Sequence, residues 1–169
     1  MSVFKTVIGV SFLQKNPSEL PYSYHWLGMF ALINILFYVV VSKALPQAHM
    51  EWLFLGHLFI QLLLFFGLLK YHRLSHRWLK FFMAILSSRL VVLVVTFLLG
   101  WLLQFSPQGF VLLFGCSAIW FVLTLGHIVR CTLDTSLSKG ILWAILVDII
   151  SNVLISPFLK DSFALLGAT

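Results

Sequence analysis

Long apolar segments recur along the chain, and short polar or charged connections separate them. They cover residues 24–42, 52–69, 79–105, 109–129 and 140–159. Each is close to the ~20 apolar residues that a helix needs to cross a hydrocarbon layer about 30 Å thick. Tryptophans lie near the segment ends, as in the aromatic belt of membrane proteins: Trp26, Trp52, Trp78, Trp101 and Trp143. The pattern predicts an all-α, polytopic membrane bundle of five transmembrane helices.

A shorter pattern precedes these segments. Phe4, Val7, Ile8 and Phe12 recur at helical spacing, but the stretch is too short to span a bilayer and has no small-residue cleavage site. The prolines at positions 17 and 21 then force an extended turn. We therefore expect a retained amphipathic interfacial helix and a Pro-rich turn over residues 1–22, a transmembrane domain over 23–160, and a short tail over 161–169.

Composition excludes a soluble globular protein. Hydrophobic residues make up 61% of the chain and charged residues only 9%, against about 25% charged in ordinary soluble domains. The net charge of +6 raises the question of nucleic acid. The cations lie between apolar segments, however, without a basic face that carries interleaved aromatic residues. We expect no nucleic-acid binding.

The positions of the cations predict an orientation by the positive-inside rule. Lys43 and Lys160 fall on one side of the membrane, and Arg89 lies inside it. The other side holds Lys5, Lys15, Lys70, Arg73, Arg77, Lys80, Arg130 and Lys139. This excess predicts that the amino terminus is cytoplasmic and that the carboxyl terminus lies outside.

Two opposite charges are expected at the same depth. Arg89 lies nine residues beyond Lys80 and Asp148 nine residues beyond Lys139, so both lie about 13 Å into the membrane. A charge at such depth costs roughly 2.5 to 3.5 kcal/mol on insertion scales, so each needs a partner. Other polar residues fall near this level: Asn34, Gln61, Cys116, Ser117 and Asn152. The layer is interpreted as an ion pair that joins helices, as a hydrated path for protons or ions, or as a site whose counter-charge comes from a partner protein.

The second connection is strongly basic and is predicted to bind anionic lipid headgroups at the cytoplasmic face. Its cations are Lys70, Arg73, Arg77 and Lys80. His72 and His76 have the spacing of metal ligands on one helix face. No acidic residue or cysteine accompanies them, and the neighbouring arginines would repel a cation.

A second possible metal group is His49, Glu51 and His57, where a wet interfacial cluster is the favoured interpretation. Neither histidine group makes a convincing ligand set. We predict no metal site and no cofactor.

The fourth and fifth segments carry a resemblance to a known family. The motif consists of Trp120, Gly126-His127, Arg130, Leu133 and the run from Ser136 to Gly140. It is similar to the last two spans of Yip1-domain proteins, particularly small inner-membrane relatives in gamma-proteobacteria, and residues 13–21 resemble the start of those relatives. The resemblance implies five spans, a bacterial inner membrane and a periplasmic carboxyl terminus. Eukaryotic members are trafficking adaptors that bind small GTPases, but their long cytoplasmic amino-terminal region is missing here, so that partnership is not carried over.

No catalytic motif is visible, and nothing resembles HExxH, GxSxG or a phosphate-binding glycine loop. The first hypothesis is a non-catalytic adaptor or accessory subunit of a membrane or envelope assembly, with the lipid bilayer and other membrane proteins as its partners. The alternative is a small transporter or ion- or proton-conducting protein that uses Arg89 and Asp148. A membrane enzyme is a third possibility and would need metal or substrate at His49, Glu51 or His57.

Overall fold

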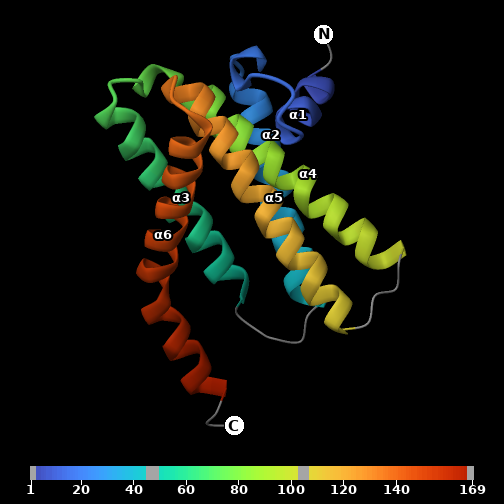
Figure 1. Ribbon diagram of the computed structural model, residues 1–169. Coiled ribbons are helices and arrows are strands. Elements are labelled where there is room, and N and C mark those ends of the chain that lie inside the picture. The colour runs from blue at the N-terminus through green and yellow to red at the C-terminus, as the bar shows by residue number, and fades with distance from the viewer. Residues whose placement is uncertain (1–2, 45–49, 103–106, 167–169) are drawn as a thin grey trace.

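The fold is built from helices. A computed structural model of the chain describes residues 3–44, 50–102 and 107–166, and no strand occurs in these ranges. Short 3-10 turns cover Pro17–Glu19 and Ser75–Arg77. The α-helices are α1 (Val3–Ser11), α2 (Tyr24–Ala44), α3 (Met50–Tyr71), α4 (Trp78–Leu102), α5 (Pro107–Leu133) and α6 (Leu137–Leu166) (Figure 1). The predicted all-α class is confirmed.

Three helices are long and apolar enough to cross a membrane. They correspond to Ser75–Leu102, Leu112–Leu133 and Leu137–Pro157. Within the described residues, α2 and α3 contain the apolar stretches Tyr24–Phe37 and Leu55–Tyr71. Both are shorter than a full span. The structure therefore establishes three candidate spans, and the five-span arrangement stays a prediction.

Helix α6 is longer than the sequence pattern indicates. The predicted segment ends at residue 159 and a tail begins at 161, whereas α6 runs through Pro157 and ends at Leu166. The prediction placed the boundary where Lys160 and Asp161 end the apolar run. A charged pair ends apolarity, but it does not interrupt backbone hydrogen bonding. Residues 161–166 of the predicted tail are thus helical.

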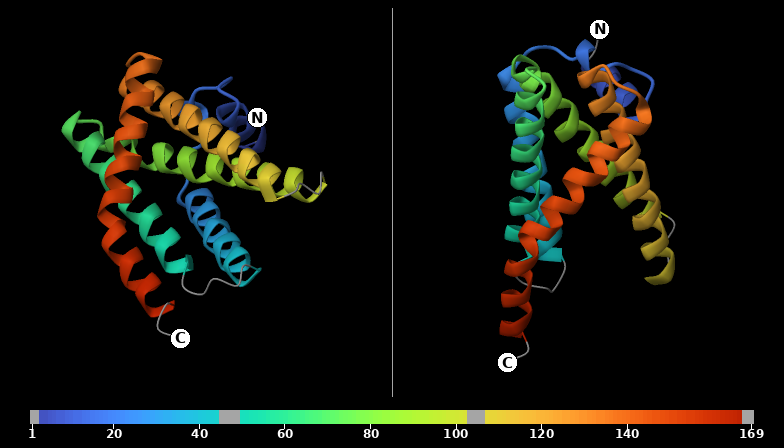
Figure 2. Two further views of the ribbon diagram at one scale, coloured as in Figure 1. Left: turned by 60° about the horizontal axis from the view of Figure 1, so that its bottom comes forward. Right: turned by 60° about the vertical axis from the view of Figure 1, so that its left-hand side comes forward.

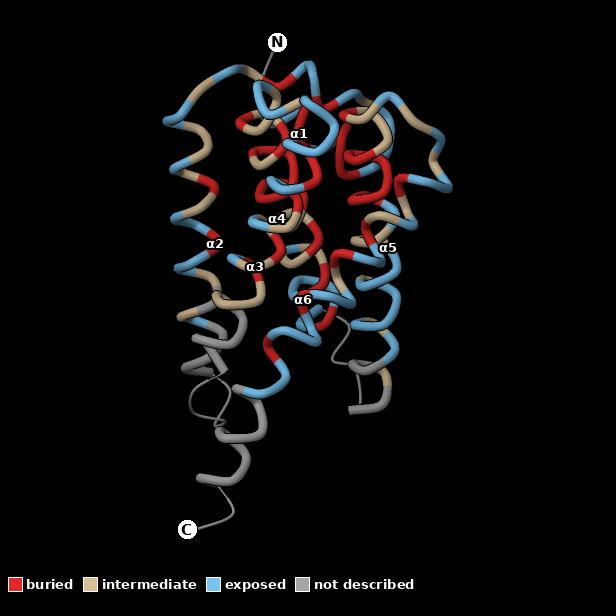
Figure 3. The backbone as a smooth tube through the Cα atoms, turned by 90° about the vertical axis from the view of Figure 1, so that its left-hand side faces the viewer, coloured by how far each residue is buried: buried red, intermediate tan, exposed pale blue. Residues whose placement is uncertain are grey.

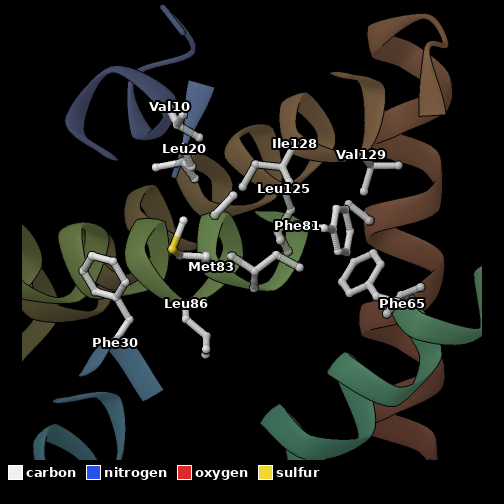
Figure 4. Packing of buried hydrophobic residues seen from close by; sticks show 14 of the residues in the cluster. Val10, Leu20, Phe30, Phe65, Phe81, Met83, Leu86, Leu125, Ile128 and Val129 are labelled. Carbon is white, nitrogen blue, oxygen red and sulfur yellow. The ribbon is translucent and has the colours of Figure 1, made fainter. Parts of the chain in front are cut away.

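The amino-terminal half of α4 is the centre of the core. Its residues from Met83 to Ser88 are all buried, as expected for a helix that is apolar all round. In Figure 4, side chains of α4 meet Phe30 of α2, Phe65 of α3 and Leu125 of α5. The rings of Phe65 and Phe81 contact each other edge to face, with centroids 5.3 Å apart. Helix α4 is therefore the central element against which α2, α3 and α5 pack.

Helices α5 and α6 form a hairpin with the shape of a V. They meet near the carboxyl end of α5 and diverge away from it (Figures 1 and 2). The contact requires glycine, because a Cβ atom at Gly140 would collide with the backbone carbonyl of Gly126. A Cβ at Gly126 would in turn lie 2.5 to 3.0 Å from atoms of Ile141. Only glycine at both positions lets the two backbones come this close.

Burial is concentrated at one end of the molecule. Figure 3 shows the buried positions gathered at the end where α1 lies, while the described parts of the helices are mostly exposed toward the other end. Exposed apolar residues on the diverging halves include Leu112 and Ile119 of α5 and Val153 of α6. This surface is suited to contact with lipid or with another apolar helix.

The amino-terminal segment docks on a polar stripe of α5. Trp120 Nε1 and Thr124 Oγ1 donate hydrogen bonds to the carbonyl of Ser11, over 2.9 and 3.1 Å. His127 Nε2 lies 2.9 Å from the carbonyl oxygen of Lys15. The carbonyl of Ser11 lies at the end of α1 and lacks a partner within the helix, so the contacts of Trp120 and Thr124 cap α1. They also explain why Trp120 lies within its segment and not in the aromatic belt.

Where α1 docks, some of its apolar residues are buried in the core and others stay exposed. Val7 and Val10 are buried in the core, whereas Phe4, Ile8 and Phe12 are about half exposed. The sequence pattern placed Val7 on one apolar face with the exposed three. The predicted apolar face is therefore only partly buried, because the protein packs against one side of it and the other side stays exposed.

Candidate functional site

The half-buried Arg89 of α4 is linked to the carboxylate of α6 through Gln61 of α3. Arg89 Nη1 donates to Gln61 Oε1 at 3.4 Å, and Gln61 Nε2 donates to Asp148 Oδ1 at 3.5 Å. Gln61 is fully buried. An amide can donate and accept at once, so Gln61 offers its oxygen to the cation and its nitrogen to the anion. We call Arg89, Gln61, Asp148, His57 and Asn152 the polar cluster.

Two further members surround the carboxylate. His57 lies one turn before Gln61 on α3, and its Nε2 is 3.6 Å from Asp148 Oδ1. Asn152 lies one turn after Asp148 on α6, and its Nδ2 donates to Asp148 Oδ2 over 3.2 Å. Both oxygens of the carboxylate therefore have a polar contact.

The two ends of the cluster lie in different surroundings. At the arginine end, the guanidinium carbon of Arg89 lies 5.6 Å from the ring centroid of Phe121, within the range of a cation–π contact. At the other end, 41% of the Asp148 side chain is exposed, and Asn152 is exposed as well. The cluster therefore extends from an aromatic contact on α5 to the exposed side of α6.

The predicted polar layer is not one network. Asn34 Nδ2 donates to the carbonyl oxygens of Phe30 and Leu86, over 2.7 and 3.0 Å, and so joins α2 to α4. Ser117 and Thr96 share a hydrogen bond of 2.5 Å that joins α5 to α4. The depth prediction placed these residues near the level of Arg89 and Asp148, and in the structure their contacts join other pairs of helices. Residues at one depth point in different directions around their helices.

Sequence reasoning missed His57 as a member of the cluster. It grouped this residue with His49 and Glu51, but His49 lies outside the described residues. Among the residues that the structure describes, no group of three His, Cys, Asp or Glu side chains could hold a metal ion. The spacing of four residues between His57 and Gln61 could have identified His57 as a member, because it places both side chains on one helix face.

The four predicted headgroup ligands fall into two pairs. Lys70 and Arg73 are exposed. Arg77 Nη1 instead donates to the carbonyl of Thr132 at 2.9 Å and lies 3.2 Å from Asp134 Oδ2. Lys80 Nζ donates to the carbonyl of Ser18 at 2.6 Å. These last two cations tie the amino-terminal turn and the end of α5 to α4, and they stand at the wall of a cavity.

The comparisons with known proteins add no relative. No protein-family model matches the chain, and neither a curated protein nor a solved structure matches it. The Yip1 resemblance therefore stays a prediction from its motif residues. Three of these residues have structural roles in this chain: Trp120 caps α1, and Gly126 and Gly140 permit the contact between α5 and α6.

Proposed function

We propose that the chain is a non-catalytic, five-span membrane protein that acts as an adaptor or accessory subunit of a membrane assembly. In this proposal the amino terminus is cytoplasmic, the carboxyl terminus is periplasmic, and the membrane is a bacterial inner membrane. The lateral face of α6 binds a transmembrane helix of a partner protein. We define this face by Asp148, Ile149, Asn152 and Val153.

The observation that carries the proposal is the exposure of Asp148 and Asn152. Both lie on a helix that is apolar enough to span a membrane, and Asp148 is about 13 Å from the cytoplasmic anchor Lys139. Lipid chains offer no hydrogen bonds, so polar groups at this depth favour contact with protein or water. Ile149 and Val153 beside them are more than half exposed. Apolar positions that flank a polar pair are typical of helix-to-helix contacts in membranes.

The chemistry of the face indicates its occupant. Asp148 provides a carboxylate acceptor, and Gln61 forms hydrogen bonds with both it and Arg89. A partner helix that carries a lysine, an arginine or an amide would complement the carboxylate, and apolar residues on either side would cover Ile149 and Val153. The partner is therefore a membrane helix with a donor near its middle.

Site-specific photocrosslinking in native membranes tests the proposal. A photoreactive phenylalanine analogue at Val153 is expected to capture one discrete partner band. The same analogue at Leu32, an exposed apolar position on α2, serves as the matched control and should capture none. Asp148→Leu in the Val153 background should reduce the crosslink at least about ten-fold, because a lost charged hydrogen bond is worth roughly 1.5 to 3 kcal/mol.

Several outcomes would contradict the proposal. Equal crosslinking from Val153 and Leu32 would indicate lipid-like random contact. A Val153 product at twice the mass of the chain would assign the face to a second copy. A band that survives Asp148→Leu unchanged would show that the carboxylate has no part in partner binding.

A second candidate function is proton or ion conduction, and the proximity of His57 and Asp148 favours it. Two titratable groups 3.6 Å apart inside a membrane protein can exchange a proton. This candidate requires that the purified chain alone carry flux in proteoliposomes and that Asp148→Asn abolish it. An adaptor carries no flux in the same assay, so the measurement separates the two candidates.

A further inference from the structure

A cavity of about 460 Å³ lies where the amino-terminal turn meets the ends of α4 and α5. Ser18 and Tyr22 form its wall on the side of the amino-terminal turn. His76, Arg77 and Lys80 contribute from the connection before α4 and from its first turn. The volume is sufficient for a phosphate group with its glycerol. By the orientation proposed above, this end of the bundle lies at the cytoplasmic headgroup level.

The charge of the cavity is suited to an anion. Arg77 and Lys80 are both partly accessible, and Asp134 is the one acidic residue among the described groups that line the cavity. Arg77 uses Nη1 for its contacts with Thr132 and Asp134, while a guanidinium has five N–H donors. Lys80 similarly uses one hydrogen bond for the carbonyl of Ser18 and has three donors. The cavity thus keeps donors and a net positive charge for a ligand.

An apolar groove adjoins this cavity. It has a volume of about 610 Å³, and His76 lines both spaces. Phe66, Trp78 and Phe82 form the apolar wall, with ring centroids of Trp78 and Phe82 5.8 Å apart and those of Phe66 and Phe82 6.5 Å apart. A small soluble anion would use only the polar cavity. A polar cavity continued by an aromatic groove matches a molecule with a charged head and an apolar chain.

We propose that these two spaces together bind one anionic phospholipid. Its phosphate lies in the polar cavity near Arg77, Lys80 and His76, and an acyl chain lies along Phe66, Trp78 and Phe82. The proposal requires a membrane-embedded chain in the stated orientation, but it does not require α6 to bind a partner. A lipid held here would join the amino-terminal turn to α3, α4 and α5.

The experiment measures lipid binding by the full chain in detergent, with phosphatidylglycerol as the probe and phosphatidylcholine as the neutral comparison. Native mass spectrometry should show phosphatidylglycerol retained in preference to phosphatidylcholine. His76→Glu places a negative charge between the two spaces without touching the core, because His76 is exposed. It should weaken phosphatidylglycerol binding about five- to ten-fold, the effect of one charge near an anionic surface. Lys5→Gln, on the exposed side of α1 at the same end, is the control and should change binding less than two-fold.

A second variant and a second probe make the outcome decisive. Phe82→Ala shortens the apolar wall and should reduce retention of the phospholipid, while the thermal unfolding of both variants without lipid is compared with that of the parent. Equal retention of the two lipids would overturn the proposal, as would an equal effect of Lys5→Gln and His76→Glu. If inorganic phosphate at millimolar concentration stabilises the chain as much as phosphatidylglycerol does, the ligand is a free phosphate and the lipid assignment fails. None of these results bears on the α6 crosslink. The lipid proposal can therefore fail while the partner proposal stands.

Discussion

At the residue scale, one amide links the two opposite charges of the polar cluster. Gln61 accepts from Arg89 and donates to Asp148, so a neutral side chain is positioned between a cation and an anion. Both bonds are long, at 3.4 and 3.5 Å, but each involves a charged partner, which strengthens a hydrogen bond. The position is also fully buried, so water does not replace a lost contact.

Gln61→Leu should therefore destabilise the protein. We expect the free energy of unfolding to fall by about 1 to 2 kcal/mol, within the range measured for polar contacts between membrane helices. Unfolding in mixed detergent micelles, followed by circular dichroism, measures it. If Gln61 acts by bridging, the double variant Gln61→Leu with Asp148→Asn loses less than the sum of the single losses. Strict additivity would mean that the amide acts only by filling space.

At the scale of elements, two glycines set the geometry of the α5–α6 hairpin. The backbones approach so closely at Gly126 and Gly140 that no side chain fits between them. The same contact fixes the point from which the two helices diverge (Figure 2). The exposed face of α6 therefore depends on a backbone contact far from Asp148.

Gly140→Ala should separate the two helices. The added Cβ meets backbone on the opposite helix, which cannot rotate away, so we expect a loss of about 1 to 3 kcal/mol, the typical cost of overpacking. Gly67→Ala in α3 is the matched control, because a Cβ there has no atom within 4 Å. It should be neutral or stabilising by up to about 1 kcal/mol, since alanine favours helix over glycine. Similar melting shifts for the two variants would contradict the close approach.

At the scale of the whole molecule, the buried core occupies one end and the helices diverge toward the other (Figure 3). The basic residues Lys15, Arg77, Lys80 and Lys139 lie at the end with the core, where the amino-terminal segment is docked. That end is rigidly packed and carries the lipid cavity. The diverging end exposes apolar helix surface, which suits the accessory role proposed above.

The five-span orientation gives a prediction for the connection between α2 and α3. In a chain with Cys116→Ser and Cys131→Ser, a cysteine introduced by Gln47→Cys should react with a membrane-impermeant maleimide added to intact spheroplasts. A cysteine introduced by His72→Cys should react only after the membrane is opened. Three spans that exclude α2 and α3 would leave both positions on the cytoplasmic side. Protection of position 47 in intact spheroplasts would therefore contradict five spans.

The sequence alone determined the helical class and the positions of the helices, because apolar runs of this length encode helices in lipid and the breaks between them are short. It also placed Arg89 and Asp148 at one level, since depth follows from residue counting along a helix. It did not determine direction around each helix axis, which depends on how the helices pack. Only the tertiary structure placed Gln61 between the charges, brought His57 to Asp148, and sent Asn34 and Ser117 to other helices. The docking of α1 on Trp120 was decided at the same level, because it joins residues 109 positions apart in the chain.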